Sequence, residues 1–472
     1  MSSGHRDGRR PRSLVGFAAG CIGALLATLL AAPGAPPAAA QVAAAVSARA
    51  GLPDRVIPAN LGIQVAWAFN RRGRSPDDGQ RPWAEGEGAL LQGAGFGYVR
   101  VFLNWPQVER MSPTGPIYVF GPQPYDFDDM VATMHQRGVR VLFVLCCAHP
   151  MMGKPITDAT RGRFAAFAAA AAARFAGKGV LFELWNEPDF PVNTAIPDDA
   201  QLSASLSLTI EQYAALASAV VPAMRRADPN VFILGYGATE CAHNPQLPYM
   251  RALGERGTLE LFDAFSLHTY GFEARPEEFE PCFRATRSLL ERFVPGRSVP
   301  VVNTEVGWST ADRVSEEMQA RNLVRTWLVG MSLGMAMNTI YDLREDLYPG
   351  ALSERENRFG IVRKGLEPKP AYTAAKAFIA TLSGFRFFER VACASPTDWI
   401  VILRSDTQTA VAAWTTAAPH STMVGLAAGP MYVVGMLGEE RTDTVPTRGL
   451  SLTISGSPVY FVRAGNQAVA TC

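Results

Sequence analysis

The sequence carries almost no net charge. It has 44 lysines and arginines against 43 aspartates and glutamates, which gives a formal charge of +1 at pH 7. Proteins that bind nucleic acid electrostatically carry a basic excess, so this balance gives no support for a nucleic-acid partner. Only 18% of the residues are charged and 48% are hydrophobic, and a chain of 472 residues with this composition suffices for a large core and a second, smaller domain.

Residues that bind transition metals are also scarce. The chain has 6 histidines and 7 cysteines, and no spacing among them resembles a zinc site. We therefore predict no metal centre.

The first forty residues read as a leader, and we assign residues 1–40 to a signal peptide. Leu14 to Ala32 is an apolar run, and Ala38 to Ala40 before Gln41 resembles a small-residue cleavage site. The apolar run is long enough to span a bilayer, so an uncleaved anchor is the competing interpretation. Prolines end the run and favour cleavage, which predicts a periplasmic or extracellular protein without stable membrane insertion. The basic residues before the run are Arg6, Arg9, Arg10 and Arg12.

After a lead-in at 41–60, apolar runs alternate with helical patterns over residues 61–382. Strict βα alternation over eight units predicts one closed parallel barrel rather than a doubly wound sheet. Expected strands are 61–69, 98–105, 139–146, 180–185, 231–236, 264–270, 300–305 and 337–343. Expected helices are 83–94, 126–137, 159–175, 211–226, 248–256, 277–293, 313–333 and 371–382.

The pattern changes after residue 383. Short apolar strands separated by turn residues replace the helical period, which predicts a small antiparallel β-sandwich over 383–472. The strands are expected at 399–403, 410–415, 431–436, 450–454 and 459–462. The predicted fold class is thus α/β, a (β/α)8 TIM barrel followed by a C-terminal antiparallel β-sandwich.

The cysteines that follow the leader fit an exported chain, in which disulfides are permitted. There are six cysteines after the leader, and six cysteines allow 15 disulfide connectivities. We predict a Cys393–Cys472 bridge, because both residues lie in the terminal region and Cys472 would otherwise end a fraying tail. Cys241 and Cys282 follow the fifth and sixth strands, whose loops are neighbours, so they are the second predicted pair. Cys146 and Cys147 are left unassigned.

Two glutamates stand at the carboxyl ends of buried strands. Glu187 follows the apolar run 180–185 in Trp-Asn-Glu-Pro, and Pro188 ends any strand pairing there. Glu305 ends the run 300–305 in Asn-Thr-Glu-Val-Gly-Trp. If Asn186 and Glu187 both reach one pocket, the strand must bulge or bend. A surface turn is the plain alternative for the first motif, but two carboxylates at two strand ends fit the machinery of glycoside hydrolysis.

Both segments resemble the acid/base and nucleophile strands of clan A glycoside hydrolases, the (β/α)8 retaining enzymes. The closest resemblance is to family 39-like and family 5-like bacterial enzymes. It implies that Glu187 is the acid/base and Glu305 the nucleophile, that the substrate is a carbohydrate, and that no metal or organic cofactor is needed. The segments Asn357-Arg358-Phe359-Gly360 and Lys369-Pro370-Ala371-Tyr372 resemble the branch associated with bacterial exopolysaccharide processing.

The resemblance also implies roles for residues around the glutamates. Arg100, within a barrel strand, needs a partner; it matches an arginine that hydrogen-bonds the nucleophile, and a structural ion pair with Glu183 is the alternative. Asn186 matches the asparagine that holds a substrate hydroxyl. His268 and Tyr270 match residues that position the substrate or the nucleophile.

Aromatic residues near strand ends are candidate sugar platforms, although packing explains any one of them. The candidates are Trp67, Trp105, Tyr341 and Trp308. Tyr341 stands at the end of strand eight, where many members of the clan have a tryptophan.

The predicted function is a retaining β-glycoside hydrolase, a monomer that acts on a bacterial exopolysaccharide or another β-linked polysaccharide. Alternatives are an exo-acting β-glycosidase or β-xylosidase on short oligosaccharides, a transglycosylase with the same residues, and a barrel that only binds sugar. A barrel that only binds sugar would lack one of the two carboxylates, and both Glu187 and Glu305 are present. No phosphate-binding glycine loop follows strand seven, which argues against other TIM-barrel classes.

Overall fold

The computed structural model describes residues 51–65, 86–121, 126–190, 206–270, 275–311, 313–345, 355–447 and 449–465. The predicted leader, Trp67 and Cys472 lie outside these residues. Within them, none of the helices combines the length and apolarity needed to cross a bilayer.

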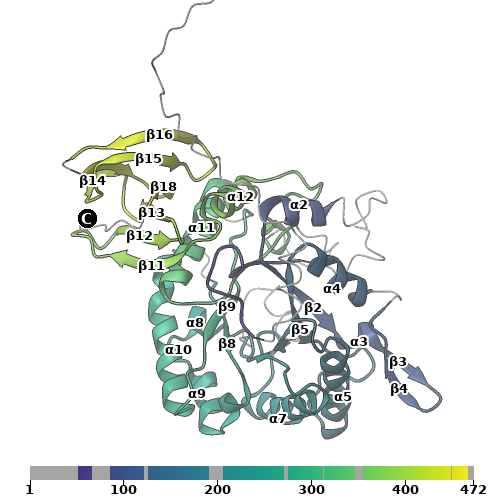
Figure 1. Ribbon diagram of the computed structural model, residues 1–472. Helices are drawn as coiled ribbons and strands as arrows, with labels where there is room; N and C mark the ends of the chain where they lie inside the picture. Colours follow the sequence, from purple (N-terminus) through teal and green to yellow (C-terminus); the bar gives the residue numbers. More distant parts are fainter. Residues whose placement is uncertain are drawn as a thin grey trace, which may run out of the picture. The chain divides into compact units, whose positions relative to one another are not determined.

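Eight parallel strands form one sheet, in the order β7-β6-β5-β2-β1-β10-β9-β8. Figure 1 labels β2, β5, β8 and β9 among them. The two end strands meet through the bridges Leu234↔Ala264 and Ala238↔Leu267, which close the sheet into a barrel. Each strand predicted from the sequence is present, within tighter bounds. They are β1 Leu61–Gln64, β2 Tyr98–Asn104, β5 Arg140–Cys146, β6 Leu181–Leu184, β7 Ile233–Leu234, β8 Phe265–His268, β9 Val301–Glu305 and β10 Asn338–Ile340.

The predicted helices surround the barrel strands. Thr157 and Thr209 begin two of the longest with reciprocal capping boxes, in which the threonine oxygen accepts a backbone N–H one turn ahead. The helices are α2 Glu87–Ala94, α4 Phe127–Gln136, α5 Asp158–Arg174, α7 Ile210–Ala227, α9 Pro248–Glu255, α10 Glu280–Phe293, α11 Glu316–Ser332 and α12 Pro370–Leu382. Short elements that the sequence patterns did not predict are α3 Trp105–Val108, α8 Glu240–His243 and the hairpin β3 Glu109–Ser112 with β4 Gly115–Tyr118.

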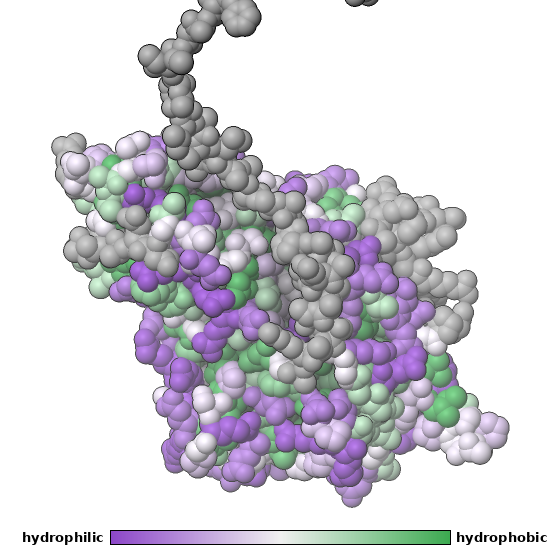
Figure 2. Space-filling view, viewed as in Figure 1, coloured by the Kyte–Doolittle hydropathy of each residue, from purple (hydrophilic) through white to green (hydrophobic). Residues whose placement is uncertain are grey.

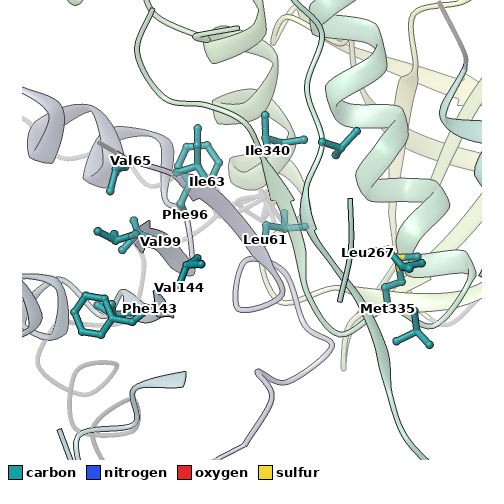
Figure 3. Close-up of a cluster of buried hydrophobic side chains, with 14 of the residues drawn as sticks. Leu61, Ile63, Val65, Phe96, Val99, Phe143, Val144, Leu267, Met335 and Ile340 are labelled. Atoms are coloured by element: carbon teal, nitrogen blue, oxygen red, sulfur yellow. The ribbon is translucent and has the colours of Figure 1, made fainter. Parts of the chain in front are cut away.

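Hydrophobic side chains fill two separate regions of the barrel. One large cluster lies between the strands and the surrounding helices, and Figure 3 shows part of it, including Leu61, Ile63 and Val65 of β1. A second, smaller cluster contains Tyr98, Leu142, Leu181, Leu234, Ala264, Val302 and Met337. Because side chains alternate along a strand, these residues share the inward face of the barrel with residues two positions further along.

After the barrel the chain forms antiparallel sheets, as predicted. A six-stranded sheet has the order β11-β12-β13-β18-β15-β16, and β14 pairs with β17. The strands are β11 Arg386–Val391, β12 Asp398–Arg404, β13 Gln408–Thr415, β14 His420–Val424, β15 Gly429–Val434, β16 Glu440–Val445, β17 Leu450–Ile454 and β18 Val459–Ala464. The sequence patterns missed β11, β14 and β16, which expose most of their side chains or alternate with polar residues and so lack an apolar run.

Glu277 connects the barrel to these C-terminal strands. Its carboxylate accepts a hydrogen bond from the Trp414 indole of β13 at 2.6 Å and pairs with Arg325 of α11 at 2.5 Å. The ring of Trp414 stacks on Trp399 of β12, with centroids 5.3 Å apart. On the face in Figure 2, hydrophilic and hydrophobic residues are interspersed over the described surface.

The disulfides confirm the second predicted pair. Cys241 of α8 is bonded to Cys282 of α10, with Cα atoms 5.6 Å apart. Cys393 is also disulfide-bonded, and its predicted partner Cys472 lies outside the described residues. Cys146 and Cys147, which the sequence left unassigned, are bonded to each other at the end of β5.

Candidate active site

Strand β6 ends in a sharp change of backbone direction. Trp185 has φ 71° and Glu187 has φ 49°, left-handed conformations that are uncommon for residues other than glycine. The Trp185 indole turns toward the protein interior, where its N–H donates to the Leu206 carbonyl at 2.7 Å. The bend expected from the sequence is therefore present, and it directs Asn186 and Glu187 toward the same region.

Glu305 ends β9 on the opposite side of the barrel. The pairing of β8 with β9 shifts register between Leu267 and His268, so that His268 lies opposite Glu305. One Glu305 oxygen accepts the Tyr270 hydroxyl at 2.7 Å, and the other accepts the Arg100 guanidinium at 2.5 Å. Burial and the nearby Glu305 carboxylate raise the pKa of Tyr270, so this phenol stays a hydrogen-bond donor.

Arg100 links the two glutamate strands. Its Nε donates to Glu183 at 2.8 Å and its Nη2 to Asn186 at 2.6 Å, while Nη1 binds both Glu305 and Gln64. The side chain is fully buried. Burial alone would lower the pKa of Arg100, but the Glu183 and Glu305 carboxylates outweigh it and the pKa is raised. The ion pair with Glu183 and the contact with Glu305, alternatives in the sequence, are thus both present.

Glu183 is a buried acid that the sequence patterns named only as a possible partner of Arg100. Besides Arg100, it accepts hydrogen bonds from Ser266 at 2.5 Å and Thr304 at 2.7 Å. Its side chain is fully buried, so these donors replace water around the carboxylate. Ser266 and Thr304 were missed because small hydroxyl residues in an apolar strand give no pattern; only the glutamate in such a strand signals a buried cluster.

His268 contacts Glu187 through Nδ1 at 2.6 Å. Its Nε2 lies 3.4 Å from Arg100, which can only donate, so Nε2 accepts and Nδ1 carries the proton that is donated to Glu187. Burial lowers the pKa of His268 to about 4, which keeps the imidazole neutral. A side chain at Gly237 would overlap Nε2, so the ring's place depends on that glycine.

Glu187, His268 and Glu305 also form the one group in the described part of the chain that offers three close metal-ligand atoms, all within 4.8 Å of one another. Both His268 nitrogens are already engaged, and the Arg100 guanidinium lies 2.5 Å from Glu305. A divalent cation would have to displace a positive charge, so this donor set suits proton transfer better than metal binding.

The predicted aromatic platforms differ in their surroundings. Trp105 is fully buried, its indole N–H bound to Glu109, so its ring offers no face to a ligand in this structure. Trp308 is also buried, and its indole N–H has no partner among the described residues. Tyr341 is partly exposed and packs edge-on against Phe359, which in turn contacts Tyr270. Trp67 lies outside the described residues.

Comparison with known families identifies the barrel. Residues 83–336 match the model of the cellulase family, glycosyl hydrolase family 5. The chain belongs to glycosyl hydrolase family 5. As a member of this family it is a glycoside hydrolase, and its substrate is a carbohydrate. The clan A resemblance of the two glutamate strands is thereby confirmed.

Solved structures share the fold of this family 5 chain. A family 39 glycoside hydrolase from Bacteroides cellulosilyticus WH2 has 22% identity and a TM-score of 0.69, over 87% of this chain and 82% of its own. A GH30 endoxylanase from Clostridium papyrosolvens C71 has 12% identity and a TM-score of 0.56, over 88% and 98%. A conserved exported protein from Bacteroides fragilis has 12% identity and a TM-score of 0.60, over 87% and 99%. No curated protein matches the sequence.

Proposed function

We propose that this chain is a retaining β-glycoside hydrolase in which Glu187 is the acid/base and Glu305 the nucleophile. The observation that carries the proposal is that the two carboxylates face one site, where each offers an oxygen and these oxygens lie within 4.8 Å of each other, a closeness that favours direct attack. Retaining enzymes hold their two carboxyl groups about 5–5.5 Å apart for direct attack, whereas inverting enzymes leave about 6.5–9.5 Å for a water molecule.

The surroundings of the two carboxylates support this division of roles. Glu305 accepts hydrogen bonds from the Arg100 guanidinium and the Tyr270 hydroxyl, and both favour the ionised form that a nucleophile needs. Glu187 is bound by the neutral imidazole of His268, which adds no positive charge against a proton on the carboxyl group.

The reaction then proceeds by double displacement. Protonated Glu187 donates its proton to the leaving oxygen while Glu305 attacks the anomeric carbon and forms a glycosyl ester. Glu187 next removes a proton from water, which releases the sugar with its original configuration. Asn186 accepts from Arg100 through Oδ1, which leaves its NH2 group to donate to a substrate hydroxyl.

For the substrate we propose a bacterial exopolysaccharide or another β-linked polysaccharide, cleaved by an exported monomer after removal of residues 1–40. The apolar leader with its small-residue cleavage site supports export, and residues 355–372 supply the exopolysaccharide-type segments. In this proposal residues 61–382 form the catalytic barrel, and the β-sandwich at 383–472 is structural.

Azide rescue tests the roles of the two glutamates. Glu305→Gly removes the nucleophile, so azide should enter the vacated space and yield an α-glycosyl azide from an activated β-aryl glycoside. Glu187→Ala still forms the covalent ester from such a substrate, so azide should displace Glu305 and yield the β-glycosyl azide. Proton NMR of the products distinguishes the anomers. Glu260→Ala, at an exposed acid of the same chain, is the control and should behave as wild type.

The stereochemistry of the wild type is the decisive measurement. A β-anomer as first product supports double displacement, and an α-anomer from a β-substrate would overturn it.

The substrate class is tested by screening the chain that begins at Gln41 against β-linked polysaccharides and 4-nitrophenyl glycosides. Activity on polymers alone selects endo cleavage, activity on short glycosides alone selects the exo alternative, and products longer than the substrate select transglycosylation.

A further inference from the structure

The disulfide between adjacent Cys146 and Cys147 lies at the carboxyl end of the barrel. Cys146 is the last residue of β5 and stands opposite Asn104, the last residue of β2. On the other side of β5, the Trp185 N–H donates to the Leu145 carbonyl at 3.0 Å, so Asn186 begins where β5 ends. The disulfide is thus placed between the ends of β2 and β6, and Asn186, the residue after Trp185, binds Arg100.

Strand alternation shows which face of β2 and of β5 carries the residues at their carboxyl ends. Arg100, Phe102 and Asn104 share one face of β2 because side chains alternate, and Arg100 reaches Glu305 from that face. Cys146 shares a face of β5 with Leu142 because side chains alternate, and it is itself buried within the large cluster that also contains Trp105. Four residues of strand separate Asn104 from Arg100, about 13 Å at 3.3 Å per residue. The disulfide therefore lies well above the layer that contacts Glu305.

The exposed atoms here combine apolar and polar character. Cys146 is buried, whereas Cys147, Asn104 and Phe102 are partly exposed. The Cys147 sulfur lies 3.5 Å from the Asn104 amide oxygen. That sulfur is bonded to Cys146 and has no hydrogen to donate, so the contact is not a hydrogen bond, and the Asn104 side chain makes none to the described residues. A soft, polarizable surface thus adjoins an amide that is free to bind a hydroxyl.

We propose that the Cys146–Cys147 disulfide and Asn104 form a sugar-binding subsite next to the ring that Glu305 attacks. A pyranose has a C–H face and a rim of hydroxyl groups, so it fits a small apolar plate with an amide at its edge. This inference rests on the proposed function, since it assigns a further substrate contact to the same active site. The occupant is a neighbouring sugar residue of a β-linked oligosaccharide.

Kinetics on substrates of different length test the subsite. For Cys146→Ala/Cys147→Ala we expect KM for the polysaccharide cleaved best in the screen to rise about tenfold with little change in kcat. The matching 4-nitrophenyl monoglycoside lacks the neighbouring sugar, so its kcat/KM should fall far less. Cys241→Ala/Cys282→Ala is the matched control: it removes a disulfide between two helices outside the barrel strands and should change neither KM. An equal loss on both substrates, or no loss, would overturn the proposal.

Two further measurements do not depend on folding of the double variant. Asn104→Ala, a change to a partly exposed side chain, should raise KM for the polysaccharide alone. In the wild type, saturating oligosaccharide from the same polymer should slow reduction of Cys146–Cys147 by a phosphine but not reduction of Cys241–Cys282, as followed by alkylation and peptide mapping. Equal reduction with and without sugar would refute the subsite. Wild-type protein that hydrolyses nothing in the screen would overturn the proposed function, and this inference with it.

Discussion

Two layers inside the same barrel have opposite chemistry. The layer nearer the amino ends of the strands is apolar apart from one phenol and comprises Tyr98, Leu142, Leu181, Leu234, Ala264, Val302 and Met337. Two positions further along four of these strands stand Arg100, Glu183, Ser266 and Thr304, joined by hydrogen bonds. One scaffold thus carries a packed layer and a charged layer, a step of two residues apart.

The difference teaches how a barrel separates stability from chemistry. In the lower layer each side chain contributes by filling space, and a change costs roughly what the lost contacts are worth. In the upper layer each charge depends on partners, because a buried ion without them is strongly destabilising. Of these two layers, only the upper one should affect activity, while stability responds to both.

The largest expected effect separates activity from stability completely. Glu305→Gln should lower kcat/KM on an activated aryl glycoside by on the order of 10^4-fold, because no covalent intermediate forms. Arg100 keeps Glu183 as a partner, so the free energy of unfolding should change little. Stopped assays and urea denaturation measure the two quantities, with Glu260→Gln as control. Residual activity within tenfold of wild type would contradict the assigned nucleophile.

Arg100→Met should lower both the activity and the stability of the protein. The change leaves the Glu183 and Glu305 carboxylates buried without their cation, which costs about 3–5 kcal/mol of unfolding free energy. Leu142→Ala in the lower layer should cost about 2–5 kcal/mol and leave kcat/KM near wild type. Adding Glu183→Gln to Arg100→Met should restore part of the stability, as a double-mutant cycle in urea shows. A fully additive cycle would argue against the ion pair.

His268, two residues beyond Ser266 on β8, should also make the barrel sensitive to acid. Its pKa is about 4 in the folded protein because of burial, against an ordinary 6.5, so the unfolded chain binds a proton first as the pH falls. The stabilising contribution is complete above pH 6.5 and is lost as the pH falls through 4, about 3 kcal/mol in all. Urea titrations at pH 7 and pH 4 measure it. His268→Gln should lose less stability over this interval, and an equal loss would refute the assignment.

The smallest expected effect concerns a single hydrogen bond in the lower, apolar layer. Tyr98 donates or accepts one hydrogen bond with Thr339, at 2.9 Å, in the apolar layer. Tyr98→Phe keeps the ring and removes that bond, so the protein should lose about 1 kcal/mol of unfolding free energy with no change in kcat/KM. A fall in kcat/KM of more than threefold would show that the two layers are coupled.

Much of this organisation could be predicted from the chain itself. Apolar runs of strand length between amphipathic helices predicted all eight barrel strands, because burial on both faces requires continuous hydrophobic sequence. The two glutamates were found because each follows such a run. The polar strands of the C-terminal sheets were missed for the same reason: the sequence of β16 at Glu440–Val445 has five exposed residues of six and no apolar signal.

The sequence by itself determined the fold class and the two carboxylates, since both depend on local patterns of apolar residues and on motifs a few residues long. Only the tertiary structure decided the partners. It joined Arg100 to both Glu183 and Glu305, set the His268 tautomer and buried Trp105 away from any ligand. These outcomes follow from closing the barrel, which brings strand ends far apart in sequence within hydrogen-bond distance. Contacts across a closed sheet depend on register and backbone bends, and no pattern along one strand encodes them.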